Sequence, residues 1–301
     1  MKYYFIVNPA AGTHSAEQSL RSALRDYSGS ERYEVHVTCG PEDAGAFLRG
    51  VRESEEGPLR VIACGGDGTL NMVVNAAQGM EDVSIGCYAC GSCNDYIKYY
   101  GETKDFLDLY RLFAAQPRDV DLMSVNGRLS VNIVDFGFDT KVVQWMERVR
   151  RLPLIGGKNA YYTGILAALL SPMSTDCKIA VDGEMMDTSS LLLATLGCGQ
   201  YVGGGYRCAP RSSNTDGWME VCLVKPLSRF RLLKLMELYR QGRHLEADSL
   251  KPLIRYRRAK NVMAHFPVET GILLDGEMMM VKDAEIRLLP QALSFLVPAG
   301  L

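Results

Sequence analysis

The sequence has no long apolar run and no marked excess of either charge. Its 301 residues include 33 Lys and Arg against 35 Asp and Glu, which gives a net charge of −2. A protein that binds nucleic acid normally carries a basic excess, so no nucleic-acid partner is expected. No stretch approaches the roughly 20 apolar residues of a membrane-spanning helix, and the amino-terminal "MKYYFIV" is too short for a signal peptide. These absences predict a cytoplasmic protein.

Established metal-binding patterns are also missing. The nine cysteines are odd in number and scattered among apolar runs, which favours reduced, buried thiols over a disulfide framework. Cys87, Cys90 and Cys93 have the spacing that starts one kind of iron–sulfur ligand set, but the Cys-Pro that completes it is absent. Core cysteines at a strand end therefore explain the cluster better. The four histidines are far apart and form no metal-binding motif.

The common nucleotide fingerprints are absent too. The chain has neither the G-x-x-x-x-G-K-[ST] loop of many ATPases nor the G-x-G-x-x-G turn of dinucleotide-binding proteins. The ordinary ATPase and dehydrogenase assignments therefore have no support.

What is present begins with an alternation of strands and helices over residues 1–122. Segments with helical spacing of apolar residues separate four short β-rich runs, which are Tyr3–Val7, Tyr33–Thr38, Arg60–Cys64 and Val83–Tyr88. Strands and helices in alternation predict a parallel sheet covered by helices on both faces, a three-layer α/β domain. Ligands of such sheets bind at the carboxyl ends of the strands.

The pattern changes after Asp121. β-rich runs joined by Asn-Gly and Asp-Gly turns dominate residues 123–289, and helical spacing is confined to Lys141–Leu170 and Arg229–Gln241. We therefore expect a second, β-rich domain over residues 123–289. The final strand, at about residues 290–301, is a candidate to rejoin the first sheet.

One acidic turn occurs twice in this second part. "VDGEMM" covers Val181–Met186 and "LDGEMM" covers Leu274–Met279. Asp-Gly readily adopts the positive φ angles of a two-residue hairpin turn, so the pattern predicts a hairpin at both places.

Three predicted strand-to-helix loops are rich in glycine. They are "NPAAG" (Asn8–Gly12), "GGDGTLN" (Gly65–Asn71) and "GSCND" (Gly91–Asp95). Glycine allows the backbone to approach a ligand closely, and a helix N-terminus adds partial positive charge, so such loops can hold an anion. "NPAAG" alone is equally consistent with a structural turn. "GGDGTLN" is more particular, because Asp67 suits a metal or a ribose and Thr69 suits a helix cap or a phosphate.

"GGDGT" after a strand resembles the signature shared by the diacylglycerol kinase catalytic-domain family and the NAD kinases. The accompanying motifs follow the order seen in the bacterial lipid kinases related to diacylglycerol and sphingosine kinases, and they are "NPAAG", "GSCND", "VDLMSVNG", "NIVDFGFD", "TDGWMEV" and "LDGE". The resemblance covers nearly the whole chain. It implies a nucleotide bound between an α/β domain and a C-terminal β-sandwich domain.

The resemblance also implies roles for individual residues. It makes Asp275 the base that accepts the hydroxyl proton, with Glu277 in the same turn, and it leaves Asp182 as a turn without a chemical role. Asp67 is expected to touch the catalytic Mg²⁺ as well as ATP. The residues implied around ATP are Asn8, Gly65, Gly66, Asp67, Gly68, Thr69 and Asn94.

Two positions depart from the pattern of the family. Cys93 stands where glycine is usual, and its Cβ narrows the conformations open to the loop. "NTDGWMEV" resembles a segment that holds a structural cation, which makes Asp216 and Glu220 candidate metal ligands, although an aspartate is more usual at position 220. The alternative is an ordinary Asp-Gly turn that enters a strand.

The expected function is therefore that of a lipid kinase that uses ATP and Mg²⁺ and phosphorylates the hydroxyl of a diacylglycerol-like or long-chain-base-like lipid. One alternative is an NAD kinase, which would need a "NE"-type adenosine loop where this chain has "GSCND". The other is a nucleotide- or lipid-binding regulator without turnover, for which Cys93 and Glu220 are the only hints. The acceptor lipid and the oligomeric state are open, and a homodimer is one hypothesis.

The basic segment Met146–Leu170 bears on the membrane. Arg148, Arg150, Arg151 and Lys158 lie among apolar residues, which suits peripheral contact with the inner membrane face. The segment is equally consistent with a solvated helix end followed by a core helix. A second basic run, Arg255–Asn261, supports membrane contact only slightly.

Overall fold

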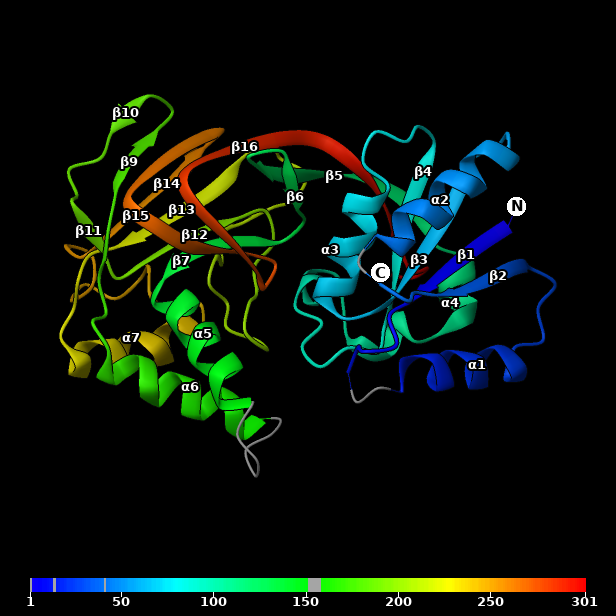
Figure 1. Cartoon of the computed structure of the whole chain (residues 1–301), viewed down its shortest axis with the longest axis horizontal. Coiled ribbons are helices and arrows are strands. Elements are labelled where there is room, and N and C mark those ends of the chain that lie inside the picture. The colour runs from blue at the N-terminus through cyan, green and yellow to red at the C-terminus, as the bar shows by residue number, and fades with distance from the viewer. Residues whose placement is uncertain (1, 13–14, 41, 151–157) are drawn as a thin grey trace.

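The computed structural model describes residues 2–12, 15–40, 42–150 and 158–301 (Figure 1). Figure 1 shows two lobes joined by long strands, with the blue and cyan N-terminal part of the chain in one lobe and most of the green-to-red remainder in the other.

The N-terminal lobe is a parallel sheet with the strand order β4-β3-β1-β2. Its strands are β1 (Lys2–Val7), β2 (Arg32–Val37), β3 (Leu59–Gly65) and β4 (Val83–Ala89). Its helices are α1 (Ala16–Asp26), α2 (Asp43–Ser54), α3 (Asp67–Ala76), the short η1 (Tyr96–Tyr99) and η2 (Thr103–Phe106), and α4 (Leu109–Phe113).

Alternate side chains of each strand enter different cores, as the pleat of a strand requires. In β1, Tyr3 and Phe5 pack with Leu20 of α1 and Leu112 of α4. Their neighbours in β1 face the opposite core, which α2 and α3 close. The lobe therefore has helices on both faces, and the predicted three-layer α/β arrangement is confirmed.

The C-terminal lobe is mostly antiparallel, with the strand order β14-β13-β12-β7-β15. Its larger strands are β7 (Ile133–Gly137), β9 (Lys178–Val181), β12 (Leu193–Gly197), β13 (Met219–Val224), β14 (Ile254–Ala259) and β15 (Asn261–Leu274). Shorter strands are β6 (Arg128–Ser130), β8 (Thr175–Asp176), β10 (Glu184–Met185) and β11 (Ser190–Leu191).

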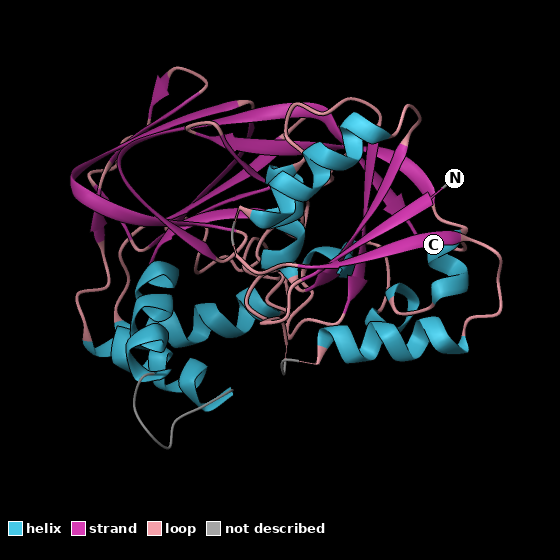
Figure 2. Cartoon of the chain, turned by 45° about the vertical axis from the view of Figure 1, so that its right-hand side comes forward, coloured by secondary structure: helices cyan, strands magenta, loops and turns pink. Residues whose placement is uncertain are grey.

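Two cores stabilise this lobe. One is enclosed by strands, with Phe136 and Phe266 edge to face at 5.1 Å. The other lies between the sheet and the helices α5 (Phe138–Arg150), α6 (Lys158–Leu170) and α7 (Arg229–Arg240). Figure 2 shows these three helices together on one side of the strands. The predicted β-sandwich domain with a few helices is confirmed.

Two long strands run through both lobes. β5 (Gln116–Val125) is antiparallel to β16 (Glu277–Val297), which starts in the C-terminal lobe as the partner of β15. Near its end, β16 pairs in parallel with β4 through Ser294 and Phe295. The domain limits expected at residues 122 and 289 therefore fall inside β5 and β16.

The predicted hairpin turns have the expected backbone. Asp182 and Gly183 have φ angles of 48° and 83°, and Asp275 and Gly276 have φ angles of 53° and 91°. Positive φ at both central residues is the requirement of a type I′ turn, so both Asp-Gly turns are confirmed as such hairpins.

Among the described residues, no helix is both long and apolar enough to cross a bilayer. Cys87 is buried in β4, Cys90 is partly buried and Cys93 is exposed. The described part of the chain contains no group of three His, Cys, Asp or Glu side chains arranged to hold a metal ion.

Candidate active site

The three glycine-bearing loops meet at the carboxyl ends of β1, β3 and β4. The amide of Gly91 donates to the carbonyl oxygen of Gly65 at 3.0 Å. A Cβ on Gly91 would lie 2.2 Å from Cα of Gly66, and one on Gly12 would lie 2.6 Å from the carbonyl oxygen of Cys90. The loops therefore pack backbone against backbone, which only glycine allows at these positions.

Helix α3 starts within the central loop. Gly66 is its N-cap residue, and no side chain caps the helix. The first amides of α3 are therefore available to an anion, in the partial positive field of the helix N-terminus. Thr69 supports the loop, because its hydroxyl accepts a bond of 3.3 Å from the side chain of Asn8 and would lie 2.1 Å from a Cβ on Gly65.

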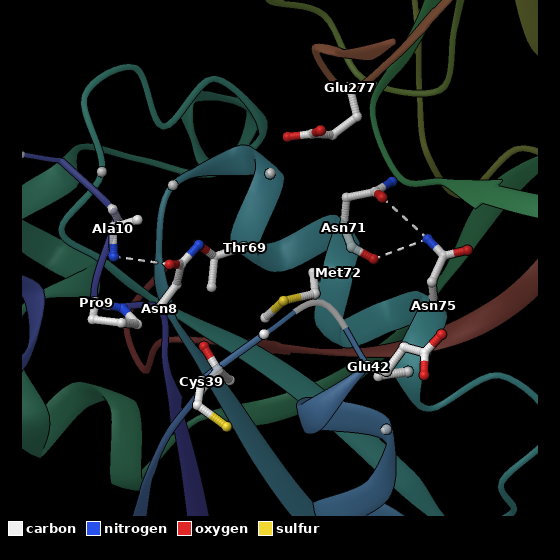
Figure 3. A pocket seen from close by; sticks show the side chains of 18 of the residues that line it. Asn8, Pro9, Ala10, Cys39, Glu42, Thr69, Asn71, Met72, Asn75 and Glu277 are labelled. Carbon is white, nitrogen blue, oxygen red and sulfur yellow. Dashed lines mark hydrogen bonds between the residues drawn. The ribbon is translucent and has the colours of Figure 1, made fainter. Parts of the chain in front are cut away.

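A cavity of about 1050 Å³ opens in front of this helix start. Five of the predicted site residues line it, namely Asn8, Gly66, Gly68, Thr69 and Glu277. The sequence did not single out many of the other lining residues, which include Thr38, Cys39, Glu42, Arg49 and Arg128. Figure 3 shows Glu277 reaching from the other lobe towards the start of α3. A nucleotide fits a cavity of this size.

Three residues expected around ATP do not line the cavity. Thr69 packs directly against Gly65. The side chain of Asp67 bonds the amide of Tyr96, which does not line the cavity. Asn94 is buried, with φ of 50°, and its side-chain amide donates to the carbonyl oxygens of Ala89 at 3.0 Å and Gly91 at 3.1 Å. Asn94 therefore holds the shape of the third loop, and direct contact with the nucleotide stays a prediction for all three residues.

Asp67 faces a second acidic residue. Its Oδ1 accepts a bond from the amide of Tyr96 at 2.9 Å. Burial, and then the nearby charge of Asp95, raises the pKa of Asp67 to about 6. Asp95 itself accepts bonds from Nζ of Lys98 at 2.5 Å and from the amide of Gly204 at 2.8 Å. The two carboxylates therefore lie where a loop of the C-terminal lobe meets the N-terminal lobe.

Asp275 is buried and receives five hydrogen bonds. Its Oδ1 accepts from Ser130 Oγ at 2.7 Å and from the amides of Asn132 and Ile133, both at 3.0 Å. Its Oδ2 accepts from Asn71 Nδ2 at 2.7 Å and from the amide of Val131 at 2.8 Å. Burial raises the pKa of Asp275, and these donors oppose the rise because they stabilise the ionised form.

Asn71 connects this carboxylate to the cavity. Asn71 lines the cavity and lies on α3, one turn after the helix start, while its side chain bonds Asp275 and also the carbonyl oxygen of Leu129 at 2.8 Å. Asn75, one turn further along α3, binds the same strand, β6, through hydrogen bonds of 2.9 and 3.0 Å to the backbone of Leu129. Helix α3 thus carries the uncapped amides at the cavity and also holds Asp275 through Asn71.

The two candidate ligands of a structural cation both contact an arginine. Arg258 binds Asp216 through Nη2, and its Nε lies 3.5 Å from Oε1 of Glu220. Burial raises the pKa of Glu220 although Arg258 lies beside it. The guanidinium already supplies the positive charge that a cation would bring, so this pair does not fit a cation site well. The metal role of Asp216 and Glu220 stays a prediction.

Sequence reasoning missed several residues of the site. Asn71 and Asp95 lie inside the glycine-bearing motifs, and helical spacing from Asp67 could have pointed to Asn71. Ser130 carries no sequence signal, because its role depends on a residue 145 positions away. Asp121 accepts bonds from the amides of Gly217 at 2.8 Å and Gln291 at 2.9 Å, which ties the lobes together at the crossing strands.

Comparison with known families agrees with this geometry. Residues 2–125 match the diacylglycerol kinase catalytic domain, and residues 132–297 match the YegS C-terminal NAD kinase beta sandwich-like domain. Together the two matches span both lobes.

Similar chains are known from several bacteria. A diacylglycerol kinase of Bacillus subtilis (strain 168) is 26% identical over 284 residues, which cover 90% of this chain and 88% of the relative. A diacylglycerol kinase of Mycobacterium tuberculosis (strain ATCC 25618 / H37Rv) is 24% identical over 302 residues, which cover 97% and 94%. A solved structure of a diacylglycerol kinase from Bacillus anthracis str. Sterne superposes with a TM-score of 0.68 at 20% identity, over 99% of this chain and 97% of that one. The structural likeness supports the fold.

Proposed function

Because the chain belongs to the diacylglycerol kinase catalytic-domain family, with a YegS-type C-terminal domain, we propose that it is a lipid kinase. The family consists of ATP-dependent lipid kinases. The proposed reaction transfers the γ-phosphoryl group of ATP to the hydroxyl of a diacylglycerol-like or long-chain-base-like lipid. The observation that supports it most directly is the bond of 2.7 Å between Asn71 on the phosphate-binding helix and buried Asp275.

The nucleotide phosphates are proposed to bind at the start of α3. The uncapped amides there and the close-packed glycine loops form a site for an anion that needs no lysine. Arg49 and Arg128 add positive charge to the cavity wall. Phosphoryl transfer depends mainly on positioning and on charge stabilisation, which a rigid set of amides can supply.

Asp275 is the proposed base. The acceptor oxygen forms a bond to the γ-phosphorus, the bond from that phosphorus to the β–γ bridging oxygen breaks, and ADP leaves with the bonding electrons. The hydroxyl proton goes to Oδ2 of Asp275, since the donor Asn71 that binds this oxygen also lines the cavity. To accept the proton, Oδ2 must exchange one of its present donors for the hydroxyl.

The protein offers only part of the coordination shell that a magnesium ion needs. Asp67 and Asp95 offer oxygen ligands of the kind that Mg²⁺ prefers, and one or two carboxylates with phosphates and water form its usual shell. Bound there, the ion would neutralise phosphate charge. The repulsion between the two carboxylates is consistent with a bound cation, and Asp95 already has one positive partner in Lys98 at 2.5 Å.

Peripheral contact with the inner face of the cytoplasmic membrane belongs to the same proposal, because a diacylglycerol-like acceptor resides in a bilayer. The cytoplasmic location stays a prediction.

The test is a transfer assay with purified protein, labelled ATP, Mg²⁺ and a panel of acceptors. The panel contains a short-chain diacylglycerol, a long-chain base and NAD. Label is expected in a lipid and not in NAD, and Asp275→Ala is expected to abolish the transfer while nucleotide still binds. Label in NAD alone would support the NAD kinase, and nucleotide binding without transfer to any acceptor would support the regulator.

A further inference from the structure

The C-terminal lobe exposes four large apolar side chains on two neighbouring helices. Leu166 and Leu170 of α6 are 60% and 76% exposed, and Phe230 and Leu233 of α7 are 87% and 54% exposed. Single exposed apolar residues are common on proteins, but a contiguous group usually marks an interaction surface. We call these four residues the apolar ridge.

Each of the two helices presents its pair of apolar side chains on one face. Leu166 and Leu170 are four residues apart, and Phe230 and Leu233 are three apart, so each pair lies on one face of its helix. The helix ends touch, since Nε of Arg229 donates to the carbonyl oxygen of Leu169 at 2.6 Å. Figures 1 and 2 both show α6 and α7 side by side beneath the strands.

The other faces of the two helices already have partners. Ala168 of α6 and Leu232 and Leu235 of α7 are buried in the core beneath the sheet. The ridge is therefore the outer face of this helical layer, and packing within the described residues does not cover it.

Positive charge lies on the α7 side of the ridge. Helix α7 carries four cations and one carboxylate, and the cations are Arg229, Arg231, Lys234 and Arg240. The carboxylate, Glu237, is paired with Arg240 at 2.8 Å. The whole chain has a net charge of −2, so this basic rim is a local feature. An apolar strip with a basic rim matches the boundary between acyl chains and anionic headgroups.

The helical layer that carries the ridge is connected to the candidate base through β7 and α5. Helix α5 follows β7 directly, and the first residue of β7, Ile133, donates its amide to Asp275.

We propose that the apolar ridge, with its basic rim on α7, is the surface by which the protein inserts into an anionic phospholipid bilayer. The inference rests on the proposed function, because a membrane-resident acceptor requires such contact. The ridge shares Leu166 and Leu170 with the segment Met146–Leu170, but its basic rim lies on α7 and not in that segment. Within the segment, Arg148 stacks on Trp145 at 5.1 Å, while Arg151 and the side chains of Arg150 and Lys158 lie outside the described residues.

The test is sedimentation with phosphatidylcholine vesicles that contain about one third phosphatidylglycerol, chosen for their negative surface. Phe230→Ser is expected to lower vesicle binding about tenfold, because the ring would no longer be buried in the acyl region. Joint Arg231→Gln and Lys234→Gln is expected to lower it on these vesicles and to leave the weaker binding to pure phosphatidylcholine unchanged. Met185→Ser is the matched control, since Met185 is 62% exposed on β10, away from α7.

Activity separates this proposal from the kinase proposal. With a water-soluble short-chain acceptor, Phe230→Ser should act as fast as the parent protein, and with a long-chain acceptor in vesicles it should be slower. Equal vesicle binding by the parent protein and Phe230→Ser would overturn the ridge and leave the kinase proposal intact. No transfer to the short-chain acceptor would overturn the kinase proposal instead. A dimer that Phe230→Ser dissociates, with vesicle binding unchanged, would assign the ridge to a second copy of the chain and overturn its membrane role.

Discussion

The two acidic turns of this chain have the same sequence core, the same backbone and the same docking bonds. The amide of Asp182 donates to the carbonyl oxygen of Asn261 at 2.9 Å, and its Oδ1 accepts from the amides of Asn261 and Lys260 at 2.8 and 3.0 Å. The amide of Asp275 donates to the carbonyl oxygen of Ile133 at 2.9 Å, and its Oδ1 accepts from the amides of Ile133 and Asn132. The two turns are therefore held in place by the same pattern of hydrogen bonds.

The difference lies in the second carboxylate oxygen. Asp182 is exposed, and within the described residues its Oδ2 accepts no hydrogen bond from the protein. Oδ2 of Asp275 is held by Asn71 and Val131, in a buried position behind the cavity. In both turns Oδ1 holds the turn in place. Only at Asp275 is the second carboxylate oxygen enclosed by residues of the neighbouring lobe, and this makes Asp275 the candidate base.

The largest expected effect contrasts the two aspartates directly. Asp275→Asn should lower phosphoryl transfer about a thousandfold, as removal of a general base does, because the new amide nitrogen cannot take a proton and faces existing donors. Asp182→Asn should stay within about twofold, since its Oδ1 contacts survive. Initial rates with labelled ATP measure both. Similar losses in the two variants would show that the turns matter only for folding.

The glycines offer the next contrast. Gly91→Ala should weaken nucleotide binding about a hundredfold, because its Cβ would lie 2.2 Å from Cα of Gly66 and force two of the glycine-bearing loops apart. Gly183→Ala, in the surface turn, should cost about 1 kcal/mol of stability because of its φ of 83° and should leave nucleotide binding unchanged. Calorimetric titration with ADP and thermal melts measure the two effects. Unchanged affinity in Gly91→Ala would remove these loops from the nucleotide site.

A third test uses pH to probe Asp67, in the glycine-bearing loop that starts α3. The pKa of Asp67 is about 6 in the folded protein and 3.8 as the ordinary value, so folding favours its protonated form. The stability this contributes is present below the ordinary pKa and is lost as the pH rises through about 6. Asp67→Asn should therefore gain on the order of 2 kcal/mol of unfolding free energy relative to the parent protein between about pH 4 and pH 7. Denaturant melts measure this, and a constant difference would contradict the burial argument.

The smallest contrast concerns the glutamates that follow the two glycines. Glu277→Gln should lower transfer about tenfold, because its carboxylate lines the cavity and would lie 3.0 Å from a Cβ on Gly68, at the start of α3. Glu184→Gln should have no effect on transfer, because Glu184 pairs with Arg257 at 2.7 Å on the surface with its side chain 70% exposed. The same rate assay measures both. Equal rates for the two variants would confine the chemistry of the turn to Asp275.

Much of the fold could be predicted from local patterns. The alternation over the first 120 residues predicted the three layers, and the Asp-Gly pairs predicted type I′ turns, since both depend on the preferences of neighbouring residues. The convergence of "NPAAG", "GGDGT" and "GSCND" followed from parallel strands, whose carboxyl ends lie at one edge. The crossing of β5 and β16 through both lobes was less accessible, because strand pairing over such separations has no local signal.

The candidate site was only partly predictable. Gly66, Gly68 and Thr69 line the cavity, as their motif suggested, but Asn94 braces a loop and Asp67 faces Asp95. Asp216 and Glu220 meet Arg258 from a neighbouring strand. Each difference comes from a partner distant in sequence, and such a partner decides what a polar side chain can do once it is buried.

By itself, the sequence determined that two turns of identical form exist and that three glycine loops can hold an anion, since backbone preference is a local property. Only the tertiary structure decided which turn could do chemistry. Asn71 and Asp275 are 204 positions apart, and their bond forms because α3 lies against the turn that starts β16. Burial and donors brought from another lobe set the chemistry of a carboxylate, and neither exists before the chain has folded.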